Sequence, residues 1–258
     1  MGDLIHEVEG GVARVTLNRP QARNALTLAM YDGLARTCRE IPTDGSIKAL
    51  IVSGAGDRAF AAGTDMTEFR GFSEPADALG YEAKMDRVLG DIERCPVATI
   101  AAITGACTGG GAAIAAACDL RLSDRRLKFG FPIARTLGNC LSVGNLGRLA
   151  ALLGHGRLTE ILMTARLIEA DEALAIGLVS EVLEEPEAVR ARAEALAAQL
   201  AAHAPLTLRA TKEGMRRLRT HGPEADDADL ITLTYMSQDF REGMEAFLAK
   251  RPPVWRGE

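Results

Sequence analysis

The sequence contains few of the residues that build metal centres and disulfide frameworks. Its four histidines, His6, His155, His203 and His221, are scattered and form no HExxH or HxxxH cluster. The five cysteines are odd in number, lie mostly within apolar runs and include no CxxC pair, which favours buried thiols over disulfides or zinc ligands. We therefore expect neither a metal site nor a disulfide framework.

The chain also lacks long apolar runs and an excess of positive charge. Asp, Arg or Gly interrupts every apolar stretch before it is long enough to span a bilayer. A net charge of −5 gives no basic footprint for nucleic acid. The first residues, with Asp3, Glu7 and Glu9, lack the basic start and apolar centre of a secretion signal. We expect a soluble, cytoplasmic protein that binds neither nucleic acid nor membranes.

The apolar residues predict an α/β core followed by helices. At 258 residues with 47% apolar side chains, the chain can bury one full core. Alternation predicts a half-buried strand over 12–17, and the continuous apolar runs 49–53 and 97–103 predict strands covered on both faces. Helices are expected near 26–41, 74–93 and 109–118, brief strands at 120–122 and 127–131, and an all-helical region from Asn145 onward.

Two glycine-bearing turns about 45 residues apart, at residues 61–66 and 108–113, each follow an apolar run. Glycine lets the backbone turn sharply, and a helix that starts straight after such a turn leaves its first N–H groups unpaired. Two such turns facing each other can hold an oxygen atom as it becomes negative. Two places after the triple glycine of the second turn, Ala113 stands where we would expect a carboxylate for acid–base chemistry.

Two other enzyme classes fit poorly. The segment 54–59 mimics a dinucleotide-binding fingerprint, but a second glycine turn follows where the long helix should be, and no acidic strand end follows at the right distance. There is no GxSxG motif and no serine directly after the triple glycine, which excludes the usual serine hydrolase arrangement.

Several ordered segments together resemble the enoyl-CoA hydratase/isomerase (crotonase) family over nearly the whole length. They are residues 15–20 with Asn24-Ala25-Leu26, 54–66, the stretch 105–119 with its triple glycine, 170–173, 177–179 and the tail 242–251. The resemblance implies an α/β fold with a crotonase-like spiral of ββα repeats in residues 1–195. It also implies a C-terminal helical region, 196–258, that serves trimerisation and the CoA pocket, with assembly as a homotrimer or homohexamer.

The resemblance further implies an acyl-CoA thioester substrate, so that coenzyme A is part of the substrate and no cofactor is permanently bound. The backbone N–H groups of Thr64 and Gly110 would form an oxyanion hole that stabilises a thioester enolate. Coenzyme A would contact residues around the first turn and, near its nucleotide end, residues in the tail. These expected contacts are Arg23, Ala61, Asp65, Met66, Phe247 and Lys250. A solvated face or helix packing would explain the tail residues equally simply.

The two glutamates that hydratases of the family use correspond here to Ala113 and Ile133, or Ala134 if one residue is inserted after Pro132. None of these side chains can move a proton, so we expect an atypical lyase or isomerase. The remaining catalytic candidates, each of which a structural role explains at least as well, are Glu68, Arg135, Asn139 and Ser142. The alternative function is a non-catalytic acyl-CoA-binding or assembly subunit.

Overall fold

Two β-sheets form the framework of the protein. The structure is a computed structural model that describes residues 2–258, so Met1, with which the expected core begins, lies outside the described residues. The six-stranded sheet has the order β1 (Leu4–Glu9), β2 (Val12–Leu17), β3 (Ala49–Gly54), β5 (Ala98–Ile103), β7 (Leu120–Asp124) and β10 (Glu181–Leu183). The four-stranded sheet has the order β4 (Ala59–Ala61), β6 (Ala106–Thr108), β8 (Lys128–Gly130) and β9 (Ile168–Glu169).

The chain alternates between the two sheets in a repeating unit. A strand of the large sheet is followed by a short strand of the small sheet and then by a helix, in the series β3-β4-α2, β5-β6-α3 and β7-β8-α4. The helices are α1 (Leu28–Glu40), α2 (Pro75–Glu93), α3 (Gly110–Ala117), α4 (Ile133–Thr136), α5 (Val143–Leu153), α6 (His155–Thr164), α7 (Ala170–Ala175), α8 (Pro186–Ala201), α9 (Pro205–His221), α10 (Ala228–Tyr235) and α11 (Gln238–Ala249). The expected α/β fold of ββα units followed by helices is thus confirmed.

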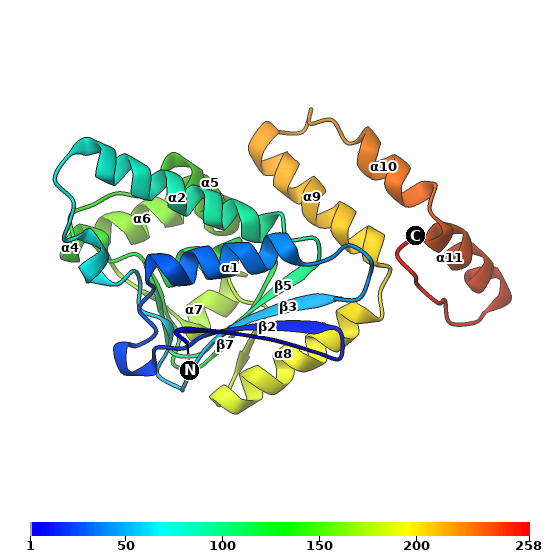
Figure 1. The fold of residues 1–258 in the computed structure, drawn as a ribbon, viewed down its shortest axis with the longest axis horizontal. Helices are drawn as coiled ribbons and strands as arrows, with labels where there is room; N and C mark the ends of the chain where they lie inside the picture. Colours follow the sequence, from blue (N-terminus) through cyan, green and yellow to red (C-terminus); the bar gives the residue numbers. More distant parts are fainter. Residues whose placement is uncertain (1) are drawn as a thin grey trace.

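Helices cover both faces of the large sheet, which explains the continuous apolar runs in its central strands. In β3, Ala49 and Ile51 pack in one cluster with Val189 and Ala193 of α8. The alternate residues Leu50 and Val52 belong to the main core, which α1 and α2 close from the other side. Figure 1 shows α1 and α2 on one side of the sheet and α8 on the other. A strand buried on both faces gains from apolar residues at every position.

The expected strands over 12–17, 49–53, 97–103, 120–122 and 127–131 all correspond to strands, and the expected helices to α1, α2 and α3. The expectation of an all-helical region after Asn145 is wrong, because β9 and β10 return to the two sheets. These strands have only two and three residues, too short for a periodic pattern. The edge strand β1 was not expected, and its polar residues His6, Glu7 and Glu9 are exposed.

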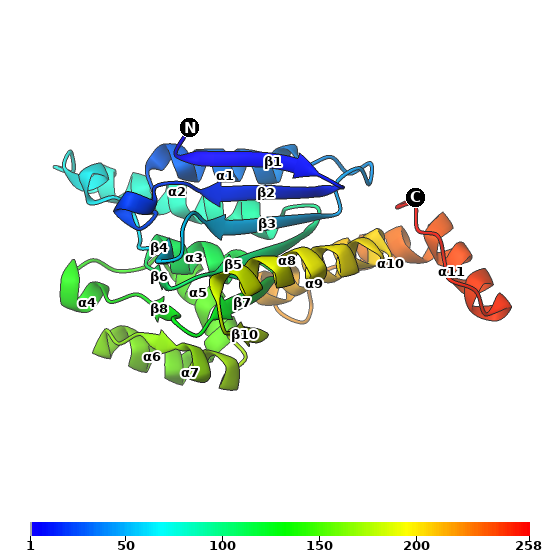
Figure 2. The same cartoon turned by 90° about the horizontal axis from the view of Figure 1, so that it is seen from below.

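The C-terminal helices α10 and α11 extend away from the sheets (Figure 2), whereas α9 is held at the large sheet by Lys212, whose Nζ donates to the Val97 carbonyl at 3.2 Å and lies 2.7 Å from Asp119. The expected boundary after residue 195 falls inside α8, whose buried residues Val189, Ala193 and Ala197 pack against the large sheet. The division into two regions therefore remains a proposal. No helix within residues 2–258 has both the length and the apolar character needed to cross a bilayer.

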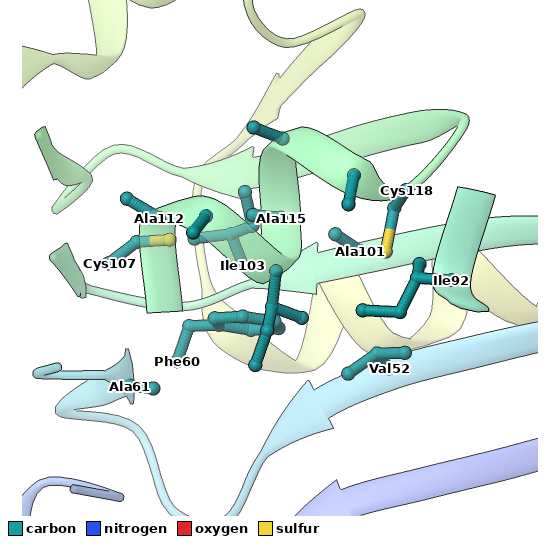
Figure 3. Packing of buried hydrophobic residues seen from close by; sticks show 14 of the residues in the cluster. Val52, Phe60, Ala61, Ile92, Ala101, Ile103, Cys107, Ala112, Ala115 and Cys118 are labelled. Atoms are coloured by element: carbon teal, nitrogen blue, oxygen red, sulfur yellow. The ribbon is translucent and has the colours of Figure 1, made fainter. Parts of the chain in front are cut away.

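Helix α3 lies deep in the core because its residues are small. All but its first residue are buried, and seven of its eight residues are Gly or Ala, the exception being Ile114. Figure 3 shows Ala112 and Ala115 of this helix packed near Phe60 and Ile103. Small side chains let a helix approach neighbouring backbone closely.

Asn24 ties the segment before α1 to the strand that precedes the first glycine turn. Its side-chain Nδ2 donates to the carbonyls of Ala59 at 2.7 Å and Ala55 at 3.0 Å, and its Oδ1 accepts from the Arg19 N–H at 3.0 Å. The residue is completely buried and has a φ of 54°. Asparagine tolerates this left-handed conformation better than most residues with a side chain.

We expect Asn24→Ala to lower the free energy of unfolding by about 3 kcal/mol, because it leaves buried backbone groups without partners. Urea denaturation measures this loss. The control is Asn18→Ala, which removes one exposed hydrogen bond to the carbonyl of Gly2 and should cost less than about 1 kcal/mol. Equal effects of the two substitutions would contradict the importance of the Asn24 bonds.

Candidate active site

A cavity of about 130 Å³ lies where the two glycine turns meet α2 and the segment around α4. Both turns, α1, α2, and residues 131–145 contribute to its wall. The lining residues are Tyr31, Ala62, Gly63, Thr64, Met66, Phe69, Tyr81, Glu82, Met85, Leu89, Thr108, Gly109, Gly110, Ala113, Phe131, Pro132, Ile133, Thr136, Leu137, Asn139, Leu141 and Asn145. The wall is thus mostly apolar, with a small number of polar groups.

The two glycine turns face each other at close range. A Cβ atom added to Gly109 would lie 3.4 Å from the Cα of Gly63, and one added to Gly111 would lie 2.5 Å from the carbonyl oxygen of Ala61. Gly63 and Gly109 also have positive φ values, 107° and 54°. Residues with a side chain would strain this conformation and separate the turns.

Each turn carries backbone N–H groups without an acceptor among residues 2–258, and those of Thr64 and Gly110 are among them. Around Thr64, the Leu26 N–H donates to the Gly63 carbonyl and the Asp65 N–H to the Leu26 carbonyl, both at 2.8 Å, while the Thr64 N–H has no partner. Gly110 is the first residue of α3, so its N–H has no acceptor within the helix, and none outside it. Both residues line the cavity.

Three hydroxyl groups form a chain beside these N–H groups. Thr64 Oγ1 lies 2.9 Å from Tyr31 Oη and 2.7 Å from Tyr81 Oη. Two hydrogen bonds use two of the three hydroxyl protons, so one proton remains to be donated elsewhere. Burial raises the pKa of Tyr31 and Tyr81, so both stay protonated at neutral pH.

Another part of the wall carries a carboxyl group and two amides. Glu82 of α2 lines the cavity, and its Oε2 accepts from the Ser142 N–H at 3.3 Å. Asn139 and Asn145 line the cavity as well, and the buried Oδ1 of Asn145 has no hydrogen-bond partner among residues 2–258. Ala113 and Ile133 occupy further parts of the wall with side chains that cannot exchange protons.

Of the expected catalytic residues, Thr64, Gly110 and Asn139 line the cavity. Ser142 lies behind the wall as the N-cap of α5, where its hydroxyl accepts from the Asn145 N–H and donates to Asp86. Two candidates are not brought to the cavity. Glu68 accepts from the Leu28 N–H at the start of α1, and Arg135 is exposed on α4.

The expected CoA contacts fall into two separate groups. Four of them, Arg23, Ala61, Asp65 and Met66, surround the first turn, and the Arg23 carbonyl accepts from the Ala62 N–H at 3.0 Å. Phe247 lies in the last turn of α11 and Lys250 is its C-cap. This helix lies at the opposite end of the molecule from α4 (Figures 1 and 2). One chain therefore does not bring all six residues together.

The sequence analysis missed Tyr31, Tyr81 and Glu82. The chain has only three tyrosines, and two of them lie at this cavity. Tyr31 lies on the buried face of α1, and Tyr81 lies within an amphipathic helix. In the sequence, neither residue can be distinguished from one that only packs in the core. Nothing in the sequence singles out Glu82 from the other acidic residues of α2.

The geometry of the site can be compared with known proteins. The Enoyl-CoA hydratase/isomerase family matches the sequence over residues 7–258. The chain belongs to this family. It is 32% identical to a short-chain-enoyl-CoA hydratase of Clostridium acetobutylicum, with 97% of this chain and 96% of that protein covered. It is 33% identical to a mitochondrial Delta(3,5)-Delta(2,4)-dienoyl-CoA isomerase of Mus musculus, with 93% and 77% covered.

A solved structure has the same fold. The crystal structure of an enoyl-CoA hydratase/carnithine racemase from Magnetospirillum magneticum superposes with a TM-score of 0.91 at 38% identity, covering 100% of this chain and 97% of that one. The chain is therefore an enzyme of the enoyl-CoA hydratase/isomerase family with an α/β crotonase fold. Members of this family act on CoA thioesters without a permanently bound cofactor.

The position of Gly110 predicts a coupling between the second turn and Tyr31. A Cβ added to Gly110 would lie 1.8 Å from Tyr31 Oη and 3.0 Å from Tyr31 Cζ. We expect Gly110→Ala to lower the free energy of unfolding by about 1–3 kcal/mol, and Tyr31→Phe to relieve part of this cost in the double variant. Urea denaturation of the four proteins measures the coupling. Strictly additive effects would contradict the contact, and Gly80→Ala, whose added Cβ meets nothing within 4 Å in the interior of α2, is the control and should not destabilise the protein.

Proposed function

We propose that the protein catalyses a reaction of acyl-CoA thioesters through an enolate, whose negative oxygen is held by the backbone N–H groups of Thr64 and Gly110. The supporting observation is that both N–H groups lack an acceptor among the described residues, although both belong to the wall of one cavity. Preorganised donors stabilise a developing oxyanion more strongly in a mostly apolar cavity than in water. Withdrawing a proton next to a thioester places charge on that oxygen.

Coenzyme A is proposed to enter along the first turn, where Arg23, Ala61, Asp65 and Met66 lie. Arg19 donates to Asp65 at 2.8 Å and Asp65 accepts from the Thr67 N–H, so the pKa of Asp65 is lowered to about 2 and the turn is held in place. Phe247 and Lys250 would contact the nucleotide end from a neighbouring copy, because α11 of the same chain extends away from the cavity. A lysine and an arginine suit the phosphate groups of the coenzyme.

Hydration by two glutamates is the reaction that the cavity supports least. It needs one group to activate water and another to protonate carbon, and the two positions implied by the family resemblance hold Ala113 and Ile133. Isomerisation, decarboxylation and thioester hydrolysis also proceed through charge on the thioester oxygen and remain compatible with the donors. The alternative is an acyl-CoA-binding or assembly subunit without turnover.

The small cavity favours short acyl groups. Its volume of about 130 Å³ is below the range of about 300–1,000 Å³ typical of ligand pockets. Phe69, Met85, Leu89 and Phe131 close parts of its wall. We propose that short acyl groups fit better than long ones.

Incubation with a panel of CoA thioesters, followed by mass spectrometry, tests the proposed function. The panel contains saturated, 2-enoyl, 3-enoyl, 3-hydroxyacyl and malonyl-type thioesters of several chain lengths, with crotonyl-CoA hydration as the reference. We expect turnover of a short-chain member by a route other than efficient hydration. Rapid water addition would contradict the argument from Ala113 and Ile133, and binding without turnover would favour the non-catalytic alternative.

The Thr64 donor is tested in the same assay. Thr64→Pro removes the N–H and should lower turnover by about 100- to 1,000-fold, whereas Thr64→Ala keeps the N–H and should lose much less. Thermal melts of both variants show whether the fold is retained. Equal turnover by the proline and alanine variants would overturn the oxyanion assignment.

The C-terminal helices are proposed to mediate assembly into a trimer or hexamer. The exposed apolar residues of these helices and of the segment after them are too numerous to be isolated surface side chains. They are Met215, Leu218, Ile231, Leu233, Tyr235, Met236, Phe240, Met244, Phe247, Leu248 and Val254. Contact with copies of the same chain would cover them and bring a partner's α11 toward the cavity.

A cytoplasmic location of the protein stays a prediction.

We expect the double substitution of Leu233→Asp on α10 with Met236→Asp at its C-cap to shift the protein from an oligomer to a monomer, because both side chains are exposed and apolar. Size-exclusion chromatography with light scattering measures the mass in solution. Leu79→Asp on α2, where Leu79 is 71% exposed, is the control and should not change the mass. A wild-type protein that is already monomeric would contradict the proposed assembly.

A further inference from the structure

Glu82 is the only carboxylic acid among the residues that line the cavity. The other lining residues with ionisable side chains are Tyr31 and Tyr81, and burial raises the pKa of both, away from neutrality. A group that takes a proton from carbon at neutral pH must be largely deprotonated before the reaction. Among the lining residues, only Glu82 meets this requirement.

The hydrogen bonds of the nearby carboxylates separate Glu82 from the others. Asp86 accepts from Ser142 Oγ at 2.9 Å and from Arg148 at 3.1 Å. Glu68 accepts from the Leu28 N–H outside the cavity wall. Glu82 accepts only the long hydrogen bond from the Ser142 N–H through Oε2, and its Oε1 has no donor among residues 2–258. Glu82 thus keeps one oxygen available to a substrate.

Helix α2 places this carboxyl group on the same wall as the oxyanion donors. Tyr81, the residue before it, bonds through its hydroxyl to the side chain of Thr64 at 2.7 Å. Both Tyr81 and Glu82 line the cavity, although adjacent residues of a helix point in different directions. The Tyr81 hydroxyl therefore connects α2 to the first turn, and Glu82, the next residue of the helix, also lies on the cavity wall.

The surroundings of Glu82 also adjust its basicity. Burial raises the pKa of the Glu82 carboxyl, the bond from the Ser142 N–H opposes this rise, and the negative charge of Asp86 adds to it. A carboxylate with a raised pKa is a stronger base toward a carbon acid while it remains ionised.

We infer that Glu82 is the catalytic residue that moves protons in this enzyme. This inference rests on the proposed function. The Glu82 carboxylate takes a proton from the carbon next to the thioester carbonyl of a 3-enoyl-CoA, and the electron pair of the broken C–H bond moves into a dienolate whose charge lies on the thioester oxygen. The protonated Glu82 then returns the proton to the far carbon, which gives the 2-enoyl-CoA and restores the carboxylate.

One carboxyl group suffices for this shift, because Glu82 first removes a proton and then returns one, and its acidic proton can exchange with solvent between the two steps. No water is added and no second acid is required. The step therefore fits a cavity in which Ala113 and Ile133 contribute no proton carrier.

The test uses the full-length protein with 3-butenoyl-CoA in deuterated water, and mass spectrometry records both isomerisation and deuterium incorporation. Glu82→Gln keeps the shape of the side chain and an oxygen that can accept from the Ser142 N–H, so the fold should be retained. Glu40→Gln, an exposed glutamate at the end of α1, is the matched control. Calorimetric titration with a non-reacting saturated acyl-CoA measures binding.

We expect Glu82→Gln to lower both rates at least about 100-fold with little change in the dissociation constant, and Glu40→Gln to match the wild type. Rates of Glu82→Gln within a few-fold of the wild type would overturn the role of Glu82 and leave the proposed function intact. Binding of acyl-CoA by the wild type without isomerisation or proton exchange would also overturn the role of Glu82. A wild type that does not bind acyl-CoA would overturn the proposed function itself.

A pH profile distinguishes proton transfer from a structural role. The wild-type rate should rise with pH as Glu82 ionises, with a midpoint above that of an ordinary glutamate, and Glu82→Gln should lack this rise.

The titratable and charged groups around Glu82 are Tyr81 and Asp86 on α2, Tyr31 on α1 and Arg148 on α5. Asp86→Asn removes a negative neighbour and should move the midpoint to lower pH, and an unchanged midpoint would contradict the assignment.

Discussion

The close approach of two backbone turns is the constraint on which the candidate site depends. Gly109 lies against the Cα of Gly63, and Gly111 lies against the carbonyl of Ala61, at distances that leave no room for a Cβ at Gly111. This contact requires short strands β4 and β6 to pair in parallel and a helix of small residues to begin directly after the second turn. The same geometry leaves the N–H groups of Thr64 and Gly110 without partners in the described chain. In the proposed function, the donors that hold the substrate oxygen therefore come from the backbone.

Helix α2 connects this backbone arrangement to the rest of the cavity. Lys84 on its exposed side pairs with Asp32 of α1, and Asp86 pairs with Arg148 of α5, so the helix is held from two directions. Exposed ion pairs contribute little to stability, but the Arg148 side chain is only 9% exposed and also contacts Glu93 at 3.0 Å. These contacts orient α2 so that Tyr81 and Glu82 are on the cavity wall. A helix whose outer residues form ion pairs therefore determines which polar groups a substrate meets.

The sequence predicted the parts of the fold that repeat a pattern over several residues. The strands β3 and β5 were evident because both faces are buried, and the two turns because glycine clusters follow apolar runs. The strands β4, β9 and β10 were not expected, since two or three residues carry no periodicity and only pairing with distant strands makes them regular. Glu82 was missed for a related reason. Its role as a wall residue depends on how α2 packs across the first turn, and that packing joins residues far apart in the sequence.

Electrostatics in the cavity link the donors to the base. The apolar wall that strengthens hydrogen bonds from the Thr64 and Gly110 N–H groups also disfavours a charged Glu82, and its pKa rises as a result. In the proposed reaction, the negative charge moves to the thioester oxygen when the carboxylate accepts a proton, toward the unpaired N–H groups and the N-terminus of α3. The charge therefore leaves the group that burial penalises and arrives where backbone dipoles favour it. One low-dielectric environment thereby favours both proton uptake by Glu82 and the charge on the thioester oxygen. A reaction with separate acid and base groups would not require one environment to favour both.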